Sequence, residues 1–101
     1  MTRPRVFCDF NKRVGQSIYG LNTVGTSQDL ERLELQLAPG VAVTVYDYDE
    51  FEDGRPAWML ADGVVVHVPG RGLAVEVDDA TFRWEAREES SDSAPRLRPA
   101  V

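Results

Sequence analysis

The stretch from Val41 to Val68 constrains the fold more than any other part of the chain. It reads VAVTVYDYDEFEDGRPAWMLADGVVVHV, with many β-branched and aromatic residues that alternate with polar ones. This alternation is typical of half-buried strands, because successive side chains of a strand point to opposite faces of the sheet. We therefore predict three strands here, over residues 41–48, 57–61 and 64–68.

Asp62-Gly63 is the strongest local turn signal in the chain. An Asp-Gly pair between apolar runs favours a type I′ hairpin turn, because both residues tolerate the positive φ that this turn demands. The sequence predicts further turns at Pro39-Gly40, at residues 69–72 and at residues 78–80. Together these signals predict consecutive hairpins, and so an antiparallel meander.

The first 40 residues give a mixed pattern. We expect a strand over Arg3 to Phe10, although Phe7 breaks its alternation and indicates that both of its faces are covered. Thr26 or Ser27 favours the start of at most one short helical turn near residues 27–32. Leu33, Leu35 and Leu37 then alternate with polar residues, which predicts another half-buried strand.

The predicted fold class is all-β: a small SH3-like antiparallel barrel or meander, with a two-sheet sandwich as the alternative. The chain has 101 residues, which suits one domain. We place that domain at residues 1–86. Residues 87–101 are polar and rich in Ser, Pro and Arg, and we expect them to form a disordered tail because they offer little to bury.

Composition excludes several classes of function. The formal net charge is −6, with 17 acidic and 11 basic side chains, so we expect neither nucleic acid nor an anionic membrane as a partner. Cys8 is the only cysteine and His67 the only histidine, which excludes an intrachain disulfide and a multi-histidine metal site. We expect no cofactor and no catalytic residues. We also expect a cytoplasmic location, since no signal peptide or spanning segment stands out.

Two resemblances bear on the fold. Val45-Tyr46-Asp47-Tyr48-Asp49 resembles the ALYDY motif of signalling SH3 domains, which supplies aromatic side chains to a groove for proline-rich peptides, although no Trp-Trp pair follows and about 40 residues precede it. Residues 6–84 also resemble a pattern in short uncharacterised bacterial proteins, through Asp9-Phe10-Asn11, Gly25-Thr26, Asp29-Leu30, Leu37, Gly40 and Tyr46. Both resemblances imply an SH3-like β-barrel, and the second implies no activity.

The candidate binding site is the acidic and aromatic stretch between the first two strands of the organising segment. Its members are Asp47, Tyr48, Asp49, Glu50, Phe51, Glu52 and Asp53. A calcium loop does not fit, because Asp53-Gly54 in its fifth and sixth positions would put Phe51 and Leu60 at ligand positions. A solvated hairpin loop whose charges prevent edge pairing is the structural alternative.

Aromatic side chains next to these carboxylates favour a protein partner. Tyr is enriched in interface hot spots and Phe at interfaces generally, while carboxylates speed the encounter with a basic surface. Tyr46, Trp58 and Trp84 are further aromatic candidates, and Trp84 alternates with Phe82, which predicts a buried position for both.

We therefore expect a non-enzymatic protein-interaction module that docks a basic protein through this stretch. The alternatives are a structural homo-oligomer, an inhibitor or immunity-like protein, and a weak metal-binding domain. A hydrolase or metal-dependent enzyme is a further class, for which the sequence offers no convergent set of titratable residues.

Overall fold

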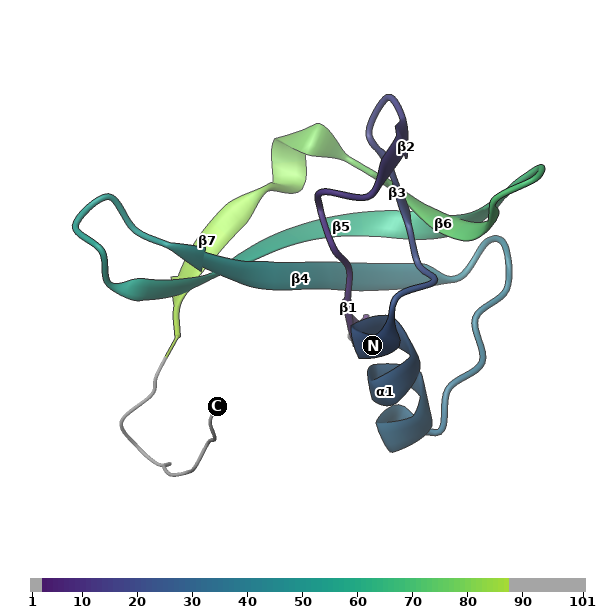
Figure 1. Ribbon diagram of the computed structural model, residues 1–101, viewed down its shortest axis with the longest axis horizontal. Coiled ribbons are helices and arrows are strands. Elements are labelled where there is room, and N and C mark those ends of the chain that lie inside the picture. The colour runs from purple at the N-terminus through teal and green to yellow at the C-terminus, as the bar shows by residue number, and fades with distance from the viewer. Residues whose placement is uncertain (1–2, 88–101) are drawn as a thin grey trace.

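The computed structural model describes residues 3–87, which form one seven-stranded sheet, one α-helix and a single 3-10 turn (Figure 1). The prediction of a mostly β protein is confirmed. The elements in chain order are β1 (Arg5–Phe7), β2 (Arg13–Gly15), β3 (Ile18–Gly20), α1 (Val24–Leu33), β4 (Ala42–Glu50), β5 (Pro56–Val68), β6 (Gly72–Val77), the 3-10 turn (Asp79–Thr81) and β7 (Arg83–Ala86).

The long strand β5 is the centre of the sheet. It pairs antiparallel with β4 along one edge, and with β7 and then β6 along the other, in the overall order β1-β4-β5-β6-β3-β2. The strand β1 pairs with β4 in parallel, so the prediction of a purely antiparallel sheet is wrong at this place. Within the described residues, β1 and β2 end the order without pairing to each other, and the sheet is not closed.

The predicted turn at Asp62-Gly63 does not exist, because both residues lie inside β5. Gly63 is opposite Val43 of β4 and opposite Val77 of β6, so the strand continues through this point without a turn. The glycine serves a close approach rather than a turn. A Cβ atom at Gly63 would lie 2.5 Å from the Glu76 carbonyl oxygen. By contrast, the predicted hairpin at residues 69–72 is confirmed between β5 and β6.

The helix α1 is longer than the predicted turn at residues 27–32 and begins earlier. Its N-cap is Thr23, whose Oγ1 accepts a hydrogen bond from the Thr26 N–H at 3.2 Å, so neither Thr26 nor Ser27 is the cap. The helix ends where Glu34 adopts a left-handed conformation with φ of 52°. The predicted strand over residues 33–37 is therefore wrong, although Leu35 and Leu37 do pack against the core from an irregular segment.

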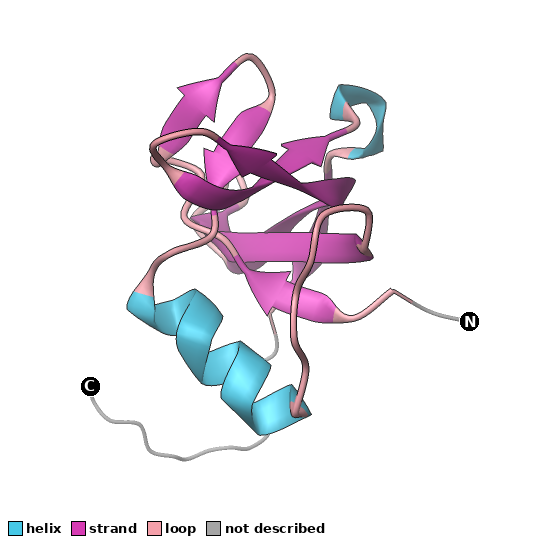
Figure 2. Ribbon diagram, turned by 90° about the vertical axis from the view of Figure 1, so that its right-hand side faces the viewer, coloured by secondary structure: helices cyan, strands magenta, loops and turns pink. Residues whose placement is uncertain are grey.

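The helix α1 lies beside β1 (Figures 1 and 2), and two of its side chains bond to the outer edge of this strand. The Phe7 N–H donates to Asp29 Oδ2 at 2.9 Å, and Thr26 Oγ1 donates to the Phe7 carbonyl at 2.7 Å. Both helix side chains are buried. They occupy the positions that a further strand would otherwise fill, which satisfies the backbone of an edge strand.

The core is made of small and β-branched side chains from the inner face of the sheet. Cys8 is fully buried among them as a free thiol. The other buried members of the cluster are Val6, Leu21, Val43, Val45, Ala61, Val65, Val75 and Val77. The predicted disordered tail, apart from Arg87, lies outside the described residues. Within residues 3–87, the one α-helix is too short and too polar to cross a membrane.

Candidate functional site

The predicted binding stretch, residues 47–53, forms the end of the β4–β5 hairpin. Asp47 to Glu50 continue β4, so only residues 51–55 make the turn and the loop is shorter than predicted. The Phe51 N–H donates to the Arg55 carbonyl at 2.9 Å, and the Gly54 N–H donates to the Phe51 carbonyl at 2.9 Å. Gly54 has a φ of 89°, which explains why a glycine follows the acidic residues.

Because Asp47 to Glu50 are in a strand, their side chains point alternately to the two faces of the sheet. Tyr48 is opposite Trp58 of β5, whereas Asp47 is opposite Met59. The structure thus separates the predicted site into two groups. Tyr48 joins other aromatic residues on the face that α1 borders, and Asp47 and Asp49 point to the opposite face.

The carboxylates of Asp47 and Asp49 both accept hydrogen bonds from within the protein. Asp47 accepts hydrogen bonds from the backbone N–H groups of Phe10 at 3.2 Å and Tyr48 at 2.7 Å, and its burial raises the pKa of its carboxyl. Asp49 accepts a hydrogen bond of 2.7 Å from the Trp84 indole N–H, which lowers the pKa of Asp49. Trp84 is 48% exposed, so the predicted buried position for this residue is wrong. Phe82 is half-buried and packs against the core.

The tip of the hairpin holds one internal ion pair. Asp53 contacts Arg55 at 2.7 Å, and the Arg55 guanidinium lies 4.9 Å from the centre of the Phe51 ring. Both contacts lie within the turn, and the ion pair neutralises the charge of Asp53. Glu50 and Glu52 are exposed, and neither makes an ion pair with another residue of the described part. Within residues 3–87, these two are therefore the exposed carboxylates of the hairpin that have no ion pair.

Four rings form a continuous cluster, which we call the aromatic face: Phe7, Tyr46, Tyr48 and Trp58. The ring centroids of Phe7 lie 5.8 Å from Tyr46 and 5.9 Å from Tyr48. Those of Trp58 lie 5.3 Å from Tyr46 and 5.1 Å from Tyr48. Such spacings are typical of favourable edge and tilted ring contacts. Tyr48 is nevertheless 60% exposed, which makes the aromatic face accessible to a partner.

A guanidinium group already lies on the aromatic face. The Arg87 group is 5.3 Å from the centre of the Tyr48 ring and 5.4 Å from that of Trp58. Its Nε also donates to the Ala57 carbonyl at 3.3 Å. This arrangement shows that two neighbouring rings of the cluster accept a planar cation, an interaction that is favourable over the electron-rich face of an aromatic ring.

Two shallow hollows flank Tyr46 between α1 and the sheet. One, of about 350 Å³, is lined by Arg5, Arg32, Leu33, Tyr46 and Trp58. The other, of about 270 Å³, includes Phe7, Tyr46 and Tyr48 in its lining. The Tyr46 hydroxyl donates to Asp29 Oδ2 at 2.5 Å, which fixes the ring between the two hollows. Burial of Tyr46, and after it this hydrogen bond, raises the pKa of Tyr46.

Sequence reasoning identified Tyr46, Tyr48, Phe51 and Trp58 as aromatic candidates but missed Phe7. The signal was present, because Phe7 breaks the alternation of the first strand and is the residue whose ring leaves the core face. His67 is exposed near the opposite end of β5, far in sequence and register from the hairpin. Within residues 3–87, no three His, Cys, Asp or Glu side chains are arranged to hold a metal ion.

No model of a protein family matches the chain. No curated protein and no solved structure gave a significant match.

Proposed function

We propose that this protein is a non-enzymatic interaction module that docks a basic segment of a protein partner. The docking surface is the aromatic face together with Glu50 and Glu52 of the neighbouring hairpin. The observation that carries the proposal is the exposure of Tyr48 within a four-ring cluster, at 60% of its surface. A large ring that is held in place yet accessible loses little conformational entropy on binding, which is typical of interface hot spots.

The chemistry of the surface favours arginine or lysine in the partner. Arg87 already shows the mode of contact, with its guanidinium over Tyr48 and Trp58. Since Tyr48 remains exposed with Arg87 in place, a second cation can approach the open side of this ring. Glu50 and Glu52 lie within the same hairpin and would pair with neighbouring basic groups.

Net charge supports the same choice of partner. A chain with a formal net charge of −6 attracts a basic protein over a distance and so raises the rate of encounter. Short-range contacts with the rings would then determine how long the complex lasts. This division predicts that added salt slows association more than it speeds dissociation.

The SH3-like architecture is part of this proposal. The strand β5 pairs with β7 through residues 57–60 and with β6 through residues 63–68 on the same edge, an arrangement that supports strong bending of the sheet. A structural homo-oligomer is the second candidate, and the exposure of Val64 and Trp84 supports it, because apolar side chains at a surface are often covered by a second copy.

The test is affinity capture from native host lysate at low and high salt, with three variants beside the wild type. Tyr48→Ala removes the exposed ring, and Glu50→Gln with Glu52→Gln removes the two unpaired carboxylates. His67→Ala is the matched control, because it changes an exposed side chain at the far end of β5. We expect the same basic partner with the wild type and the control, weakened binding with the double variant, and none with Tyr48→Ala.

Two results would contradict the proposal. A partner retained by both test variants would move the docking surface elsewhere on the molecule. Recovery of the protein itself alone, with a mass in light scattering that increases with concentration, would establish the homo-oligomer in its place.

A further inference from the structure

The basic side chains of this acidic protein are distributed unevenly. Of the 11 Lys and Arg residues, all but Arg96 and Arg98 lie in the described part of the chain. Most of these have a visible partner: Arg3 and Arg83 pair with Asp62, Arg5 with Glu85, Arg32 with Asp29 and Arg55 with Asp53, while Arg87 lies over aromatic rings.

The three that remain are Lys12, Arg13 and Arg71, and none makes an ion pair with a carboxylate of residues 3–87. All three line one hollow of about 350 Å³, between the β2–β3 hairpin and β6. No acidic side chain is part of that lining. In a chain with more acidic than basic residues, three unpaired cations around one hollow form a local positive site.

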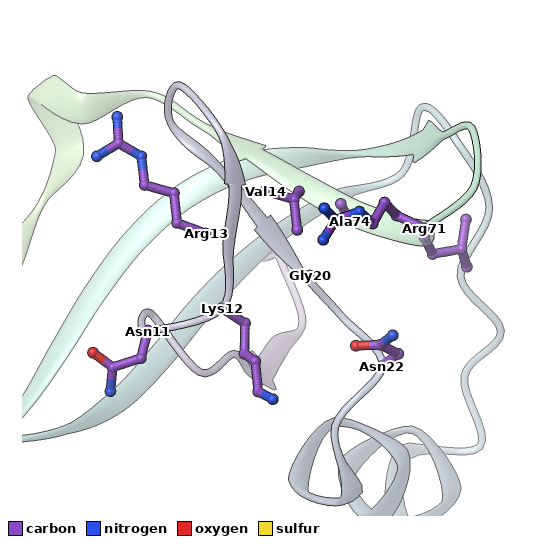
Figure 3. A pocket seen from close by; sticks show the side chains of 9 residues that line it. Asn11, Lys12, Arg13, Val14, Gly20, Asn22, Arg71 and Ala74 are labelled. Carbon is purple, nitrogen blue, oxygen red and sulfur yellow. The ribbon is translucent and has the colours of Figure 1, made fainter.

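Figure 3 shows how these side chains lie. Arg71 extends from the turn before β6 towards Val14, so its guanidinium is beside the apolar part of the hollow. Lys12 and Asn22 lie near the base of the β2–β3 hairpin, on the side of the helix, and the Lys12 side chain points away from Arg71, as does Arg13 on the other side. The Arg13 Nε also donates to the Gly15 carbonyl at 3.0 Å, so part of its donor capacity is used locally. Arg71 is therefore the cation beside the apolar part of the hollow, and Lys12 is a second, more distant positive charge in its lining.

We propose that this hollow binds a small organic oxyanion, a compound with a phosphate or carboxylate group on a compact apolar body. Arg71 would donate two parallel hydrogen bonds to the oxyanion, as the guanidinium fork allows, and Lys12 would add a point charge. The Asn22 amide supplies a further donor, and Val14 and Ala74 supply apolar contact. A hollow of this size is within the range of small-molecule sites, which combine apolar walls with a few polar groups.

This site is separate from the proposed docking surface. It involves β2, β3 and β6, whereas the aromatic face and the acidic hairpin involve β1, β4 and the first half of β5 (Figure 1). The two proposals therefore stand or fail independently.

The experiment is a titration of the isotopically labelled full chain, followed by the backbone amide signals in two-dimensional NMR at low salt. The probes are phenyl phosphate, benzoate and inorganic phosphate. We expect phenyl phosphate or benzoate to cause saturable shifts centred on Lys12, Asn22 and Ala74. Whichever of the two binds more tightly identifies the head group.

The variant Arg71→Gln should weaken binding by about tenfold or more, the loss expected for a hydrogen bond to a charged group. Lys12→Gln should weaken binding by a smaller factor, because it removes only a nearby positive charge. Arg55→Gln is the matched control, because it removes the same charge at the other end of the molecule and should leave the affinity unchanged. The amide spectrum of each variant also reports whether it is folded.

Three results would overturn the proposal. The first is the absence of saturable shifts at millimolar concentrations of all three probes. The second is an equal loss of affinity in Arg55→Gln, which would mean that only the overall charge matters. The third is binding of inorganic phosphate as tight as that of both organic anions, which would remove the apolar part of the site.

Discussion

Gly63 offers the sharpest test of how the sheet is built. It lies in the middle of β5, between β4 and β6, with no space on the side of β6. A Cβ atom there would lie 2.5 Å from the Glu76 carbonyl oxygen, 2.8 Å from Val75 Cγ2 and 3.0 Å from Val77 Cα. Two of these three atoms belong to the backbone, so the clash cannot be relieved by a change of rotamer alone.

The cost of Gly63→Ala follows from this geometry. Extra volume in a well-packed interior costs about 1–3 kcal/mol, and we expect a value near the upper end because the β5–β6 ladder itself must shift. For a domain of this size each kcal/mol lowers Tm by about 4–8 °C, so the variant should melt more than about 10 °C below the wild type. Urea unfolding followed by fluorescence of Trp58 and Trp84 measures the change directly.

Two further variants identify the cause. Gly70→Ala is the control, because Gly70 has a φ of 79° and a Cβ atom there would meet nothing within 4 Å, so only the conformational cost of about 1–2 kcal/mol applies. Gly63→Asn distinguishes the strand from a type I′ turn. A turn would tolerate Asn well, whereas the strand should be destabilised by Asn at least as much as by Ala. Wild-type stability of Gly63→Asn would refute the reasoning.

Two other predictions concern titratable groups. Burial alone would raise the pKa of Asp29, but hydrogen bonds from Tyr46, Arg32 and the Phe7 N–H together hold it below its usual value. Its carboxylate should therefore stabilise the fold above about pH 4, with the contribution lost as the pH falls through the lowered pKa. Urea unfolding of Asp29→Asn should then show a weaker loss of stability on acidification, and pH dependences identical to the wild type would contradict this. Burial, with the negative charges of Asp47 and Asp9, raises the pKa of Cys8 to about 12. A thiol-specific reagent at pH 8 should consequently react slowly with the folded wild type and faster with Gly63→Ala, and equal rates would disprove a protected thiol.

Local signals predicted the β4–β5 and β5–β6 region well, with one exception. Alternation located the strands around residues 41–48 and 64–68, and the Pro69-Gly70 turn was found from its residue types. The turn prediction at Asp62-Gly63 was wrong because glycine is found for two different reasons. It allows positive φ in turns, and it lets neighbouring backbones approach closely in a sheet. Only the position of β6, which comes later in the chain, decides between them.

The first 40 residues were harder to predict because their structure depends on distant contacts. The strand β1 is only three residues long and pairs with β4, almost 40 residues later. The alternation of Leu33, Leu35 and Leu37 was correctly assigned to partial burial of Leu35 and Leu37, but burial does not require a strand partner. A left-handed residue at Glu34 sufficed to turn the chain from helix to an extended segment.

The candidate site shows the same limit. The sequence predicted residues 47–53 as a single binding epitope. Asp47 and Tyr48 are neighbours in a strand, however, so their side chains point to opposite faces of the sheet. Phe7 and Arg87 join Tyr48 from the two ends of the described chain, and Lys12 and Arg71 line the same hollow although they are distant in the sequence. No spacing rule connects residues so far apart, so these groupings required the fold.

Asp29 links the fold to the proposed docking surface. The same carboxylate oxygen accepts the Phe7 N–H and the Tyr46 hydroxyl, so it holds the backbone of β1 and one ring of the aromatic face at once. Thr26 completes the arrangement by donating to the Phe7 carbonyl. The helix α1 therefore does more than cover an edge strand, because its side chains also set where Phe7 and Tyr46 lie. Since Tyr48 contacts Phe7, the geometry offered to a partner depends on a helix that does not itself carry any of the four rings.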